Sequence, residues 1–458
     1  MRLISKDNRT VIVGLGLTGI SCARYLKKKG LPFSLVDSRK EPPYLSTVES
    51  EFPDIPVHLG DICAEALQGA SRVVVSPGVP LDHPAIKQVM SGGVSVLGDI
   101  DLFRAEASAP IVAITGSNGK STVTTLLGEM LKEAGKDVAI GGNIGIAALD
   151  LLQGESPDYY VLELSSFQLE RTSNLCVEVA TVLNVSADHM DRYDNLSAYK
   201  NAKHKIFQGC KKIVFNRADS SSIPANSTST EVGSFGLDNP GLNEFGLVQH
   251  EIDGVDVEFL AFQQDLLMPT SELKLAGRHN LENALAAMSL AHAVGLDFAP
   301  MLTVLKLFPG LDHRCKFVAK FEGVDYYNDS KGTNVGAAIA SIKGLTRRLG
   351  KIVLIAGGES KGADFSPLLP VLKSCVRAVI AVGEAAVQIE ELCAECVSVE
   401  RASSMEEAVV SASRRAKEND VVLLSPACAS FDMFENYQQR GEVFCDSVLR
   451  LFDGGACS

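Results

Sequence analysis

Residues 115–122 read TGSNGKST, which has the residue types of a phosphate-binding loop. The apolar run IVAI precedes it and the helix-like run VTTLLGEMLKEAG follows it, the strand–loop–helix context that such a loop needs. Backbone N–H groups could wrap phosphates, Lys120 could reach a transferred phosphoryl group, and the Ser121 hydroxyl could ligate Mg²⁺. Ile114 stands where a strict Walker A motif has glycine, so the match is to a shorter TGxxGKST form. A chance Gly-Lys-Ser in a loop is the alternative, and the flanking elements argue against it.

A second group of polar residues lies between positions 160 and 203. LELSSFQLE places Glu163 at the end of an apolar run, and SADHMDRY contains His189 between Asp188 and Asp191. Parallel strands end at the same edge of a sheet, so the Glu163 carboxylate is expected beside the phosphate loop, where it could ligate Mg²⁺. His189 and its acidic neighbours alone would be more typical of a solvated surface cluster. The nearby phosphate loop favours a functional site.

A third motif, GxGxxG, is formed by Gly14, Gly16 and Gly19 directly after an apolar strand, with Asp37 at the end of the next strand. This spacing is typical of dinucleotide-binding dehydrogenases, in which the acidic residue accepts hydrogen bonds from ribose. The turn itself requires only a phosphate at a helix N-terminus. A nicotinamide cofactor and a uridine diphosphate sugar therefore both remain open from this motif.

The composition limits the class of protein. The chain has 458 residues, 46% of them hydrophobic, which is enough for two or three domains. It has no apolar run near 20 residues and no signal-peptide pattern, so a cytoplasmic protein is expected. The net charge of −13 argues against a nucleic-acid-binding surface. The eleven cysteines include one CxxC without zinc-spaced partners, which favours reduced thiols.

Strand-like runs that end at glycine or polar turns occur in three successive segments, so we predict a three-domain α/β protein. The boundaries are expected near 98 and 310, giving domains at 1–98, 99–310 and 311–458. A helix with a continuous apolar face is expected at 280–296. The strand-like runs are TVIVG, FSLVD, RVVVSPG, PIVAIT, DYYVLELSS, VEVATVLNV, KKIVFN, KIVLIAGG, VRAVIAVG and DVVLLSP.

Six motifs in a fixed order resemble the Mur ligase family over essentially the whole chain. They are TGSNGKST, ELSSFQLE, DHMDRY, AGRHNLENALAA, NDSKGTN and SPACASFDMFENYQQRGEVF. The first and fourth are similar across Mur and folylpolyglutamate ligases, whereas ELSSFQLE and SPACAS resemble the branch that adds D-glutamate. The resemblance implies an N-terminal Rossmann-like UDP-binding domain, a central P-loop ATPase-like domain and a C-terminal Rossmann-like domain.

The implied reaction is the ATP-dependent addition of D-glutamate to UDP-N-acetylmuramoyl-L-alanine, in cytoplasmic peptidoglycan precursor synthesis. It would proceed through an acyl phosphate and a tetrahedral intermediate, and closure of the third domain would complete the site. The resemblance also implies two Mg²⁺ sites and a carbamylated lysine, for which Lys203 is preferred over Lys200 and Lys205. A monomer without nucleic-acid or membrane partners is expected. No residue is singled out as the general base.

The family pattern assigns site residues by position. The uridine nucleotide and muramoyl group would contact Leu17, Thr18, Asp37, Ser38, Arg39, Gly78, Asn143, Ser165, Gln168 and His189. ATP would contact Gly116, Ser117, Asn118, Gly119, Lys120, Ser121, Thr122, Asn280, Asn283, Arg314, Asp329 and Lys331. The amino acid would contact Thr333, Lys361, Ser430, Phe431 and Tyr437, and the metal ligands would be Ser121, Glu163, His189 and carbamylated Lys203. The residues expected to act in catalysis are Lys120, His189, Lys203 and Lys331.

Two positions depart from the family pattern, because Phe431 replaces leucine and Tyr437 replaces phenylalanine. The first changes only bulk if the backbone makes the contact, and the second adds a hydroxyl group near the amino-acid site. Three rival functions remain: another Mur or folylpolyglutamate ligase, a nicotinamide dehydrogenase, and a non-catalytic UDP-sugar-binding regulator. The intact lysines and Glu163 make the last the weakest.

Overall fold

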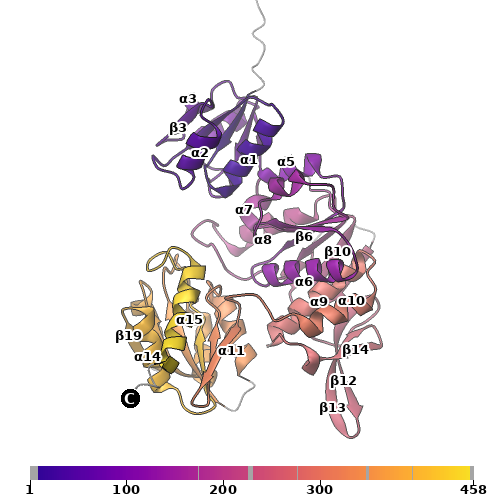
Figure 1. The fold of residues 1–458 in the computed structure, drawn as a ribbon, viewed down its shortest axis with the longest axis vertical. Helices are drawn as coiled ribbons and strands as arrows, with labels where there is room; N and C mark the ends of the chain where they lie inside the picture. Colours follow the sequence, from indigo (N-terminus) through magenta and orange to yellow (C-terminus); the bar gives the residue numbers. More distant parts are fainter. Residues whose placement is uncertain are drawn as a thin grey trace, which may run out of the picture.

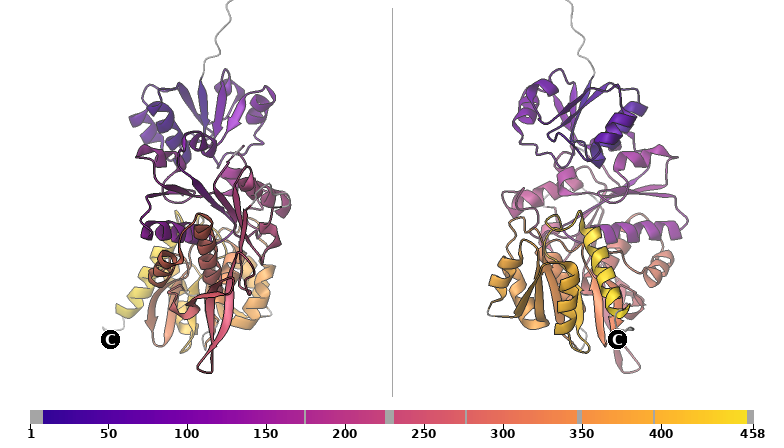
Figure 2. Two further views of the ribbon diagram at one scale, coloured as in Figure 1. Left: turned by 90° about the vertical axis from the view of Figure 1, so that its right-hand side faces the viewer. Right: turned by 60° about the vertical axis from the view of Figure 1, so that its left-hand side comes forward.

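The computed structural model describes residues 9–173, 175–224, 231–275, 277–346, 350–394 and 396–453. It contains three sheets, each built from one continuous stretch of chain and covered by helices (Figure 1). The predicted class, a three-domain α/β protein, is confirmed. Figures 1 and 2 show the first sheet stacked on one end of the middle part, and the third sheet beside the other end.

The first sheet has five parallel strands in the order β3-β2-β1-β4-β5. The order reverses between β1 and β4, and ligands of open α/β sheets bind at the carboxyl ends of the strands at such a point. The strands are β1 (Thr10–Val13), β2 (Phe33–Asp37), β3 (Val57–Leu59), β4 (Arg72–Val75) and β5 (Ser95–Leu97). The helices are α1 (Leu17–Lys28), α2 (Leu45–Glu51), α3 (Ala64–Leu67) and α4 (Pro84–Ser91).

The middle sheet has nine strands in the order β14-β13-β12-β11-β10-β9-β6-β8-β7. Its strands are β6 (Ile111–Thr115), β7 (Val138–Gly142), β8 (Tyr159–Glu163), β9 (Val179–Val182), β10 (Lys212–Asn216), β11 (Glu231–Phe235), β12 (Glu244–Ile252), β13 (Val255–Phe262) and β14 (Asp265–Pro269). Its α-helices are α5 (Asp99–Glu106), α6 (Lys120–Glu133), α7 (Ser166–Leu169), α8 (Leu196–His204), α9 (Arg278–Ala293) and α10 (Phe298–Leu307). Short 3₁₀ turns occur at η1 (Ala148–Gln153), η2 (Lys205–Phe207), η3 (Ser220–Ser222) and η4 (Thr270–Glu272).

Strands β6 and β8 are parallel neighbours, with Ile114 opposite Glu163. The phosphate loop and the Glu163 carboxylate therefore leave the sheet at the same edge, as expected. The predicted apolar helix is present as α9, which packs on α6.

The strands β11–β14 were not predicted from the sequence. β12 and β13 form a long antiparallel hairpin with Phe245 opposite Phe262, and its tip turns at Asp253 and Gly254 with φ of +52° and +81°. The Asp-Gly pair between two alternating runs is the signal that could have revealed this hairpin. Figure 1 shows it projecting from the middle part, away from the first sheet.

The third sheet has the order β15-β16-β20-β17-β18-β19, with only β15 antiparallel to its neighbour. Its strands are β15 (Lys316–Phe321), β16 (Val324–Asn328), β17 (Ile352–Gly357), β18 (Val376–Val382), β19 (Ser398–Ala402) and β20 (Val421–Leu424). The helices are α11 (Val335–Leu345), η5 (Ser366–Leu368), α12 (Leu369–Cys375), α13 (Ala386–Cys393), α14 (Met405–Arg415) and α15 (Tyr437–Asp453). The predicted strands at 351–358, 376–383 and 420–426 correspond to β17, β18 and β20.

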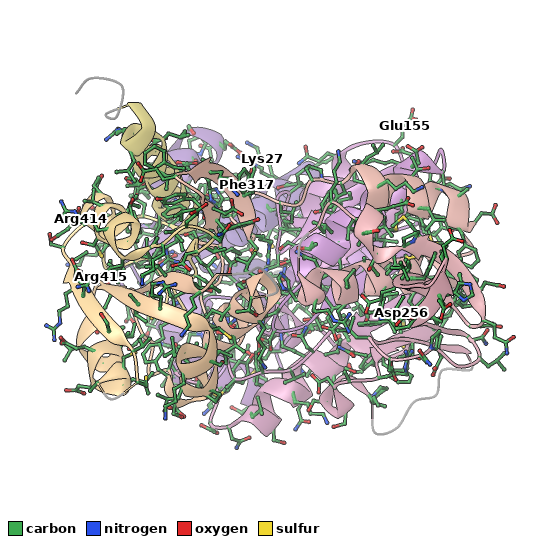
Figure 3. All side chains as sticks on the ribbon, turned by 90° about the horizontal axis from the view of Figure 1, so that it is seen from below. Lys27, Glu155, Asp256, Phe317, Arg414 and Arg415 are labelled. Atoms are coloured by element: carbon green, nitrogen blue, oxygen red, sulfur yellow. The ribbon has the colours of Figure 1, made fainter. Side chains whose placement is uncertain are left out.

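Some charged side chains extend from the periphery of the molecule, whereas others are buried in the candidate site described below. Figure 3 shows Glu155, Arg414 and Arg415 pointing outward at its periphery. Among the described residues, no helix combines the length and apolar composition needed to cross a bilayer.

We predict that Phe245→Ala lowers the free energy of unfolding by about 3–5 kcal/mol, because it leaves a cavity in the core. Phe245 is 1% exposed, and its ring lies 4.7 Å from Phe262 and 5.8 Å from His292 of α9. Urea unfolding followed by circular dichroism would measure the loss. Val255→Ala at the hairpin tip, where Val255 is 62% exposed, is the control and should change stability by less than about 0.5 kcal/mol. Equal effects of the two substitutions would contradict the assigned core.

Candidate active site

The phosphate loop runs from the end of β6 to the start of α6, with two glycines in conformations that other residues avoid. Gly116 has φ of +155° and Gly119 has φ of +85°. The loop is braced by Asn184, whose carbonyl oxygen accepts from Ser117 N at 2.9 Å and whose Oδ1 accepts from Asn118 N at 2.8 Å. Asn184 follows β9 and was not identified from the sequence.

Two lysine amines converge on the carbonyl oxygen of Gly116. Lys120 Nζ donates to it at 2.7 Å and Lys203 Nζ donates at 3.0 Å. Lys203 is 1% exposed, and its Nζ lies 4.3 Å from the centre of the Tyr199 ring. Burial lowers the pKa of Lys203 well below its usual value, and the charge of Lys120 lowers it further. The structure thus brings together two of the residues predicted to act in catalysis and favours a neutral Lys203 amine.

Glu163 is buried beside this pair. Its Oε1 accepts from Asn143 Nδ2 at 2.8 Å, whereas its Oε2 is buried without a hydrogen-bond partner among the described residues. Ser121 Oγ accepts from Arg314 Nη2 at 2.7 Å.

These oxygen donors suit a hard cation such as Mg²⁺, which commonly takes one or two protein ligands and completes its shell with water and phosphate oxygens. Within the described ranges, no three histidine, cysteine, aspartate or glutamate side chains are placed to share an ion. The orphaned Glu163 oxygen and the Ser121 hydroxyl therefore fit a magnesium that also needs substrate phosphates. His189 and Lys203 remain the predicted ligands of a second magnesium.

His189 lies where the middle and third parts meet. It adopts a left-handed conformation with φ of +57°, and its ring centroid lies 4.8 Å from that of Phe167. Burial lowers the pKa of His189, Asp188 opposes this shift, and Lys361 reinforces it. The neutral imidazole can accept a hydrogen bond or bind a metal ion.

A cavity of about 400 Å³ separates His189 from the predicted amino-acid site. Thr333 and Lys361 line the same cavity as His189, and Lys361 is held in a left-handed turn with φ of +49°. Lys361 Nζ lies 5.2 Å from the centre of the Phe431 ring, which is 65% exposed. Ser430 is buried next to Phe431. A cavity with an ammonium on one side suits a small carboxylate.

Tyr437 occupies a different place from the other predicted amino-acid contacts. Its ring lies 3.7 Å from Lys331 Nζ, a predicted ATP contact, at the start of α15. The buried side chain of Arg440, which is 1% exposed, lies three residues after Tyr437 and contacts the loop that carries Lys331. Arg440 donates to Ser330 O at 2.8 Å and to Ala429 O at 3.0 Å, so it joins the loop of Lys331 to that of Ser430. Arg440 was not identified from the sequence.

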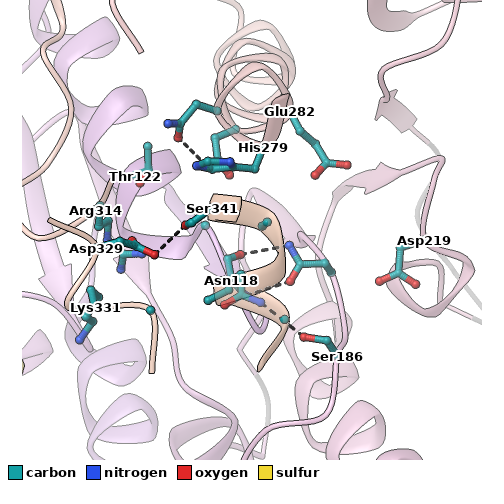
Figure 4. Close-up of a pocket in the computed structure, with 18 of the residues that line it drawn as sticks. Asn118, Thr122, Ser186, Asp219, His279, Glu282, Arg314, Asp329, Lys331 and Ser341 are labelled. Atoms are coloured by element: carbon teal, nitrogen blue, oxygen red, sulfur yellow. Dashed lines mark hydrogen bonds between the residues drawn. The ribbon is translucent and has the colours of Figure 1, made fainter. Parts of the chain in front are cut away.

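A second cavity, of about 300 Å³, lies between α9, the phosphate loop and the third part (Figure 4). It is lined by predicted ATP contacts: Asn118, Gly119, Thr122, Asn280, Asn283, Arg314, Asp329 and Lys331. Burial lowers the pKa of Lys331 to about 8, and Arg314 adds to this shift. Burial raises the pKa of Asp329 to about 6, although Ser341 and Ser425 donate hydrogen bonds to its carboxylate.

Asn334 links the two sides of this junction. Its Nδ2 donates to Asn118 Oδ1 at 3.2 Å and to Asp188 Oδ2 at 3.1 Å. The third part is therefore in direct contact with the phosphate loop. Asn334 was not assigned a contact from the sequence, and Asp188 was named only as an acidic neighbour of His189.

The glycine motif of the first sheet has an open side. A Cβ atom on Gly19 would come 1.9 Å from Gly14 O, whereas one on Gly16 would meet nothing within 4 Å. Gly16 therefore faces space that a ligand can enter. The neighbouring Asp37 carboxylate is already engaged, because Oδ2 accepts from Leu15 N at 2.7 Å and the Arg39 guanidinium donates to both oxygens.

The remaining predicted UDP contacts are spread over two parts of the molecule. Leu17 and Thr18 begin α1, Ser38 follows β2, and Gly78 follows β4, all at the carboxyl edge of the first sheet. Ser165 and Gln168 instead form a capping box at the start of α7, where Gln168 N donates to Ser165 Oγ at 3.2 Å. They lie on the middle part, as does Asn143.

Two arginines that were missed from the sequence hold these parts together. Arg192 donates to Pro77 O at 3.3 Å and to Gly78 O at 3.4 Å, and its guanidinium lies 4.5 Å from the centre of the Phe167 ring. Arg171 donates to Val79 O. The predicted nucleotide loop of the first part is thus bound to the segment that carries His189.

Three family models match successive parts of the chain. They are the Mur ligase MurD-like N-terminal domain at residues 8–98, the Mur ligase middle domain at 114–291 and the Mur ligase glutamate ligase domain at 313–428. Solved structures with the same fold include a UDP-N-acetylmuramate–alanine ligase from Thermotoga maritima, with a TM-score of 0.60 and 19% identity over 96% of this chain and 99% of that one. A MurF ligase from the same organism, solved with ADP, has a TM-score of 0.59 and 15% identity over 98% of this chain and 100% of that one.

Closer relatives are found among curated sequences. The UDP-N-acetylmuramoylalanine–D-glutamate ligase of Pseudomonas aeruginosa is 52% identical over 453 residues, covering 98% of this chain and 100% of the relative. That of Marinobacter nauticus is 48% identical, covering 97% and 98% respectively. The three domain models and these full-length relatives agree on the family. The chain therefore belongs to the Mur ligase family, within the group of UDP-N-acetylmuramoylalanine–D-glutamate ligases.

Proposed function

We propose that the chain joins D-glutamate to UDP-N-acetylmuramoyl-L-alanine with hydrolysis of ATP, in peptidoglycan precursor synthesis. The names of its relatives support this substrate pair. The observation that carries the proposal is that the two cavities share a wall, since Ser186 and Gly336 line both. A nucleotide in one cavity and an amino acid at Lys361 in the other would thus lie side by side.

The first step is attack of the terminal carboxylate of the UDP substrate on the γ-phosphorus of ATP. The carboxylate oxygen forms a bond to phosphorus, the bond to the β-phosphate oxygen breaks, and an acyl phosphate and ADP result. Both reactants are anionic, so their approach is opposed by repulsion. Lys120 and Arg314 at the phosphate loop offset this repulsion, which is a main contribution to such reactions. Magnesium bound at Ser121 and Glu163 would supply further positive charge.

In the second step the neutral amine of D-glutamate attacks the carbonyl carbon of the acyl phosphate. The new C–N bond gives a tetrahedral intermediate, which expels phosphate and leaves the amide after the nitrogen loses its proton. Lys361 would orient the amino acid through a carboxylate, and His189 would contact the muramoyl end from across the cavity. Catalysis would depend chiefly on positioning and electrostatics.

Lys203 is proposed to be carbamylated. An unprotonated amine attacks the carbon of CO₂, forming an N–C bond and releasing one proton, so a depressed lysine pKa favours the modification. The resulting carbamate is an anionic oxygen donor, which suits a magnesium ion better than an ammonium does. The burial of Lys203 against Gly116 O, next to the Lys120 ammonium, supports this proposal.

The proposal includes the remaining expectations of the family. The domains would span 1–98, 99–310 and 311–458, and the enzyme would act as a cytoplasmic monomer on three small-molecule substrates. The glycine motif would then serve a uridine nucleotide, and a nicotinamide cofactor would have no role. The third domain would move relative to the middle domain during turnover.

We expect phosphate release only when ATP, UDP-N-acetylmuramoyl-L-alanine and D-glutamate are all present. L-glutamate, L-lysine and meso-diaminopimelate serve as comparison amino acids, and mass spectrometry would identify the amide product. Turnover with another amino acid would overturn the proposed substrate but retain the reaction. Binding of the UDP substrate without any turnover would instead favour a regulator.

We expect Lys203→Ala to reduce kcat by about 10²–10³-fold, because it removes the site of the proposed carbamate. Carbon-13 NMR of protein equilibrated with labelled bicarbonate should show a carbamate resonance in the wild type that is absent in this variant. Lys200→Ala, on the same helix, is the matched control and should keep the resonance. The carbamate proposal fails if the wild type shows no such signal.

We expect kcat/KM for ATP to fall by about tenfold per pH unit above pH 8, because the Lys331 ammonium loses its proton near its pKa of about 8. The protonated form, present below this pH, is the one that attracts phosphate. In Lys331→Arg the guanidinium stays charged, so the decline should disappear. An unchanged pH profile in the arginine variant would contradict this role. The other two substrates are kept saturating.

A further inference from the structure

The nucleotide cavity is electrically polarised. Figure 4 shows the cations Arg314 and Lys331 on one side and the carboxylates of Glu282 and Asp219 on the other. The Asp329 carboxylate on the cationic side is occupied by hydrogen bonds from Ser341 and Ser425. The phosphates of a nucleoside triphosphate would be drawn to the cationic side, so the carboxylate side would face the base.

The two asparagines of α9 that are predicted to contact ATP lie close to each other and to the phosphate loop. Asn283 Nδ2 donates to Asn280 Oδ1 at 3.2 Å, and a Cβ atom on Gly119 would come 2.3 Å from Asn283 Oδ1. Asn283 therefore lies directly over the phosphate loop. The exocyclic amino group of adenine has two N–H bonds, so an acceptor farther along the cavity can receive one of them even if an asparagine of α9 receives the other.

Glu282 is suitably placed to be that acceptor. It projects from α9 into the cavity, and Asn216 Nδ2 donates to its Oε1 at 2.8 Å. The other oxygen, Oε2, receives no hydrogen bond from any residue that the structure describes. In Asp219, by contrast, both carboxylate oxygens already accept hydrogen bonds. Oδ2 accepts from Val185 N at 2.7 Å and Oδ1 accepts from Ser221 N at 2.8 Å.

Two neighbouring residues, His279 and Asn216, determine the charge and the orientation of Glu282 at the carboxylate side of the cavity. Burial lowers the pKa of His279 to about 4, so its ring is uncharged and adds no cation near Glu282. Asn216 is itself anchored, because its Nδ2 also donates to Leu183 O at 3.0 Å. The Glu282 carboxylate is thus held in one orientation by a group fixed to the end of β10.

We propose that Glu282 determines the preference for adenine, by accepting a hydrogen bond from the exocyclic amino group of ATP at Oε2. This proposal rests on the ATP-dependent function proposed above. A nucleotide without that amino group would leave Oε2 of Glu282 desolvated and without a hydrogen bond. A base with a carbonyl group at that position would place its carbonyl oxygen against Oε2, and two acceptors repel each other.

The test compares ATP with purine riboside 5′-triphosphate, which lacks only the amino group. In the wild type we expect kcat/KM to be at least about tenfold higher for ATP, the factor of one hydrogen bond to a charged group. In Glu282→Ala the two nucleotides should become equivalent within about twofold. Glu282→Gln, which keeps the size of the side chain, should show a reduced preference.

Asp219→Asn is the matched control at the same end of the cavity. Its carboxylate organises the backbone, so the variant should weaken both nucleotides equally and keep their ratio. The proposal is overturned if the wild type does not distinguish the two nucleotides, or if Asp219→Asn abolishes the preference while Glu282→Ala retains it. Calorimetric titration with ATP separates failure of the proposed function from failure of the proposed role of Glu282. A wild type that binds no ATP would refute the ATP-dependent function itself.

Discussion

The carbonyl oxygen of Gly116 accepts hydrogen bonds from two lysine amines, and the active site depends on this contact. Two ammonium groups so close together in a buried setting repel one another, so one amine is driven toward its neutral form. Burial lowers the pKa of both lysines, and Glu163 and Asp188 oppose this shift at both. Lys203 is the more deeply buried amine. A single backbone oxygen thus holds together the two amines that we propose to bind phosphate and to carry the carbamate.

This contact requires three strands to end together. β6 carries the phosphate loop, β8 carries Glu163 and β9 leads to Asn184, and all three are adjacent and parallel. The buried apolar residues of these strands hold the edge in place on both faces of the sheet. A shift in register of one residue would move Glu163 away from the loop. The packing of the sheet therefore fixes the positions of the loops that carry the candidate site residues.

Local sequence patterns predicted the parts of the site that lie next to a strand. The phosphate loop, Glu163 and helix α9 each follow from a short motif and its flanking apolar run. The sequence could not predict contacts that depend on how the parts pack. Arg192 against Pro77, Asn334 against Asp188, and Tyr437 against Lys331 each join segments far apart in the chain. The hairpin β12–β13 has only one short local signal, the Asp253-Gly254 pair at its tip.

Arg171 and Arg192 donate across the junction to backbone carbonyl groups, and both also pair with the Glu170 carboxylate on their own side of it. The acceptors on the first part are carbonyl groups, which do not gain a proton in the physiological range. Backbone acceptors also persist whatever side chains mutation places at positions 77–79.

The hairpin formed by β12 and β13 ends in a turn at Asp253 and Gly254 that projects from the middle part. Its tip lies outside both cavities, and no residue from 244 to 262 lines either of them. Exposed turns of this kind tolerate inserted sequence. The hairpin therefore offers a point at which a fluorescent reporter or a surface tether could be attached to the enzyme without obstructing its substrates.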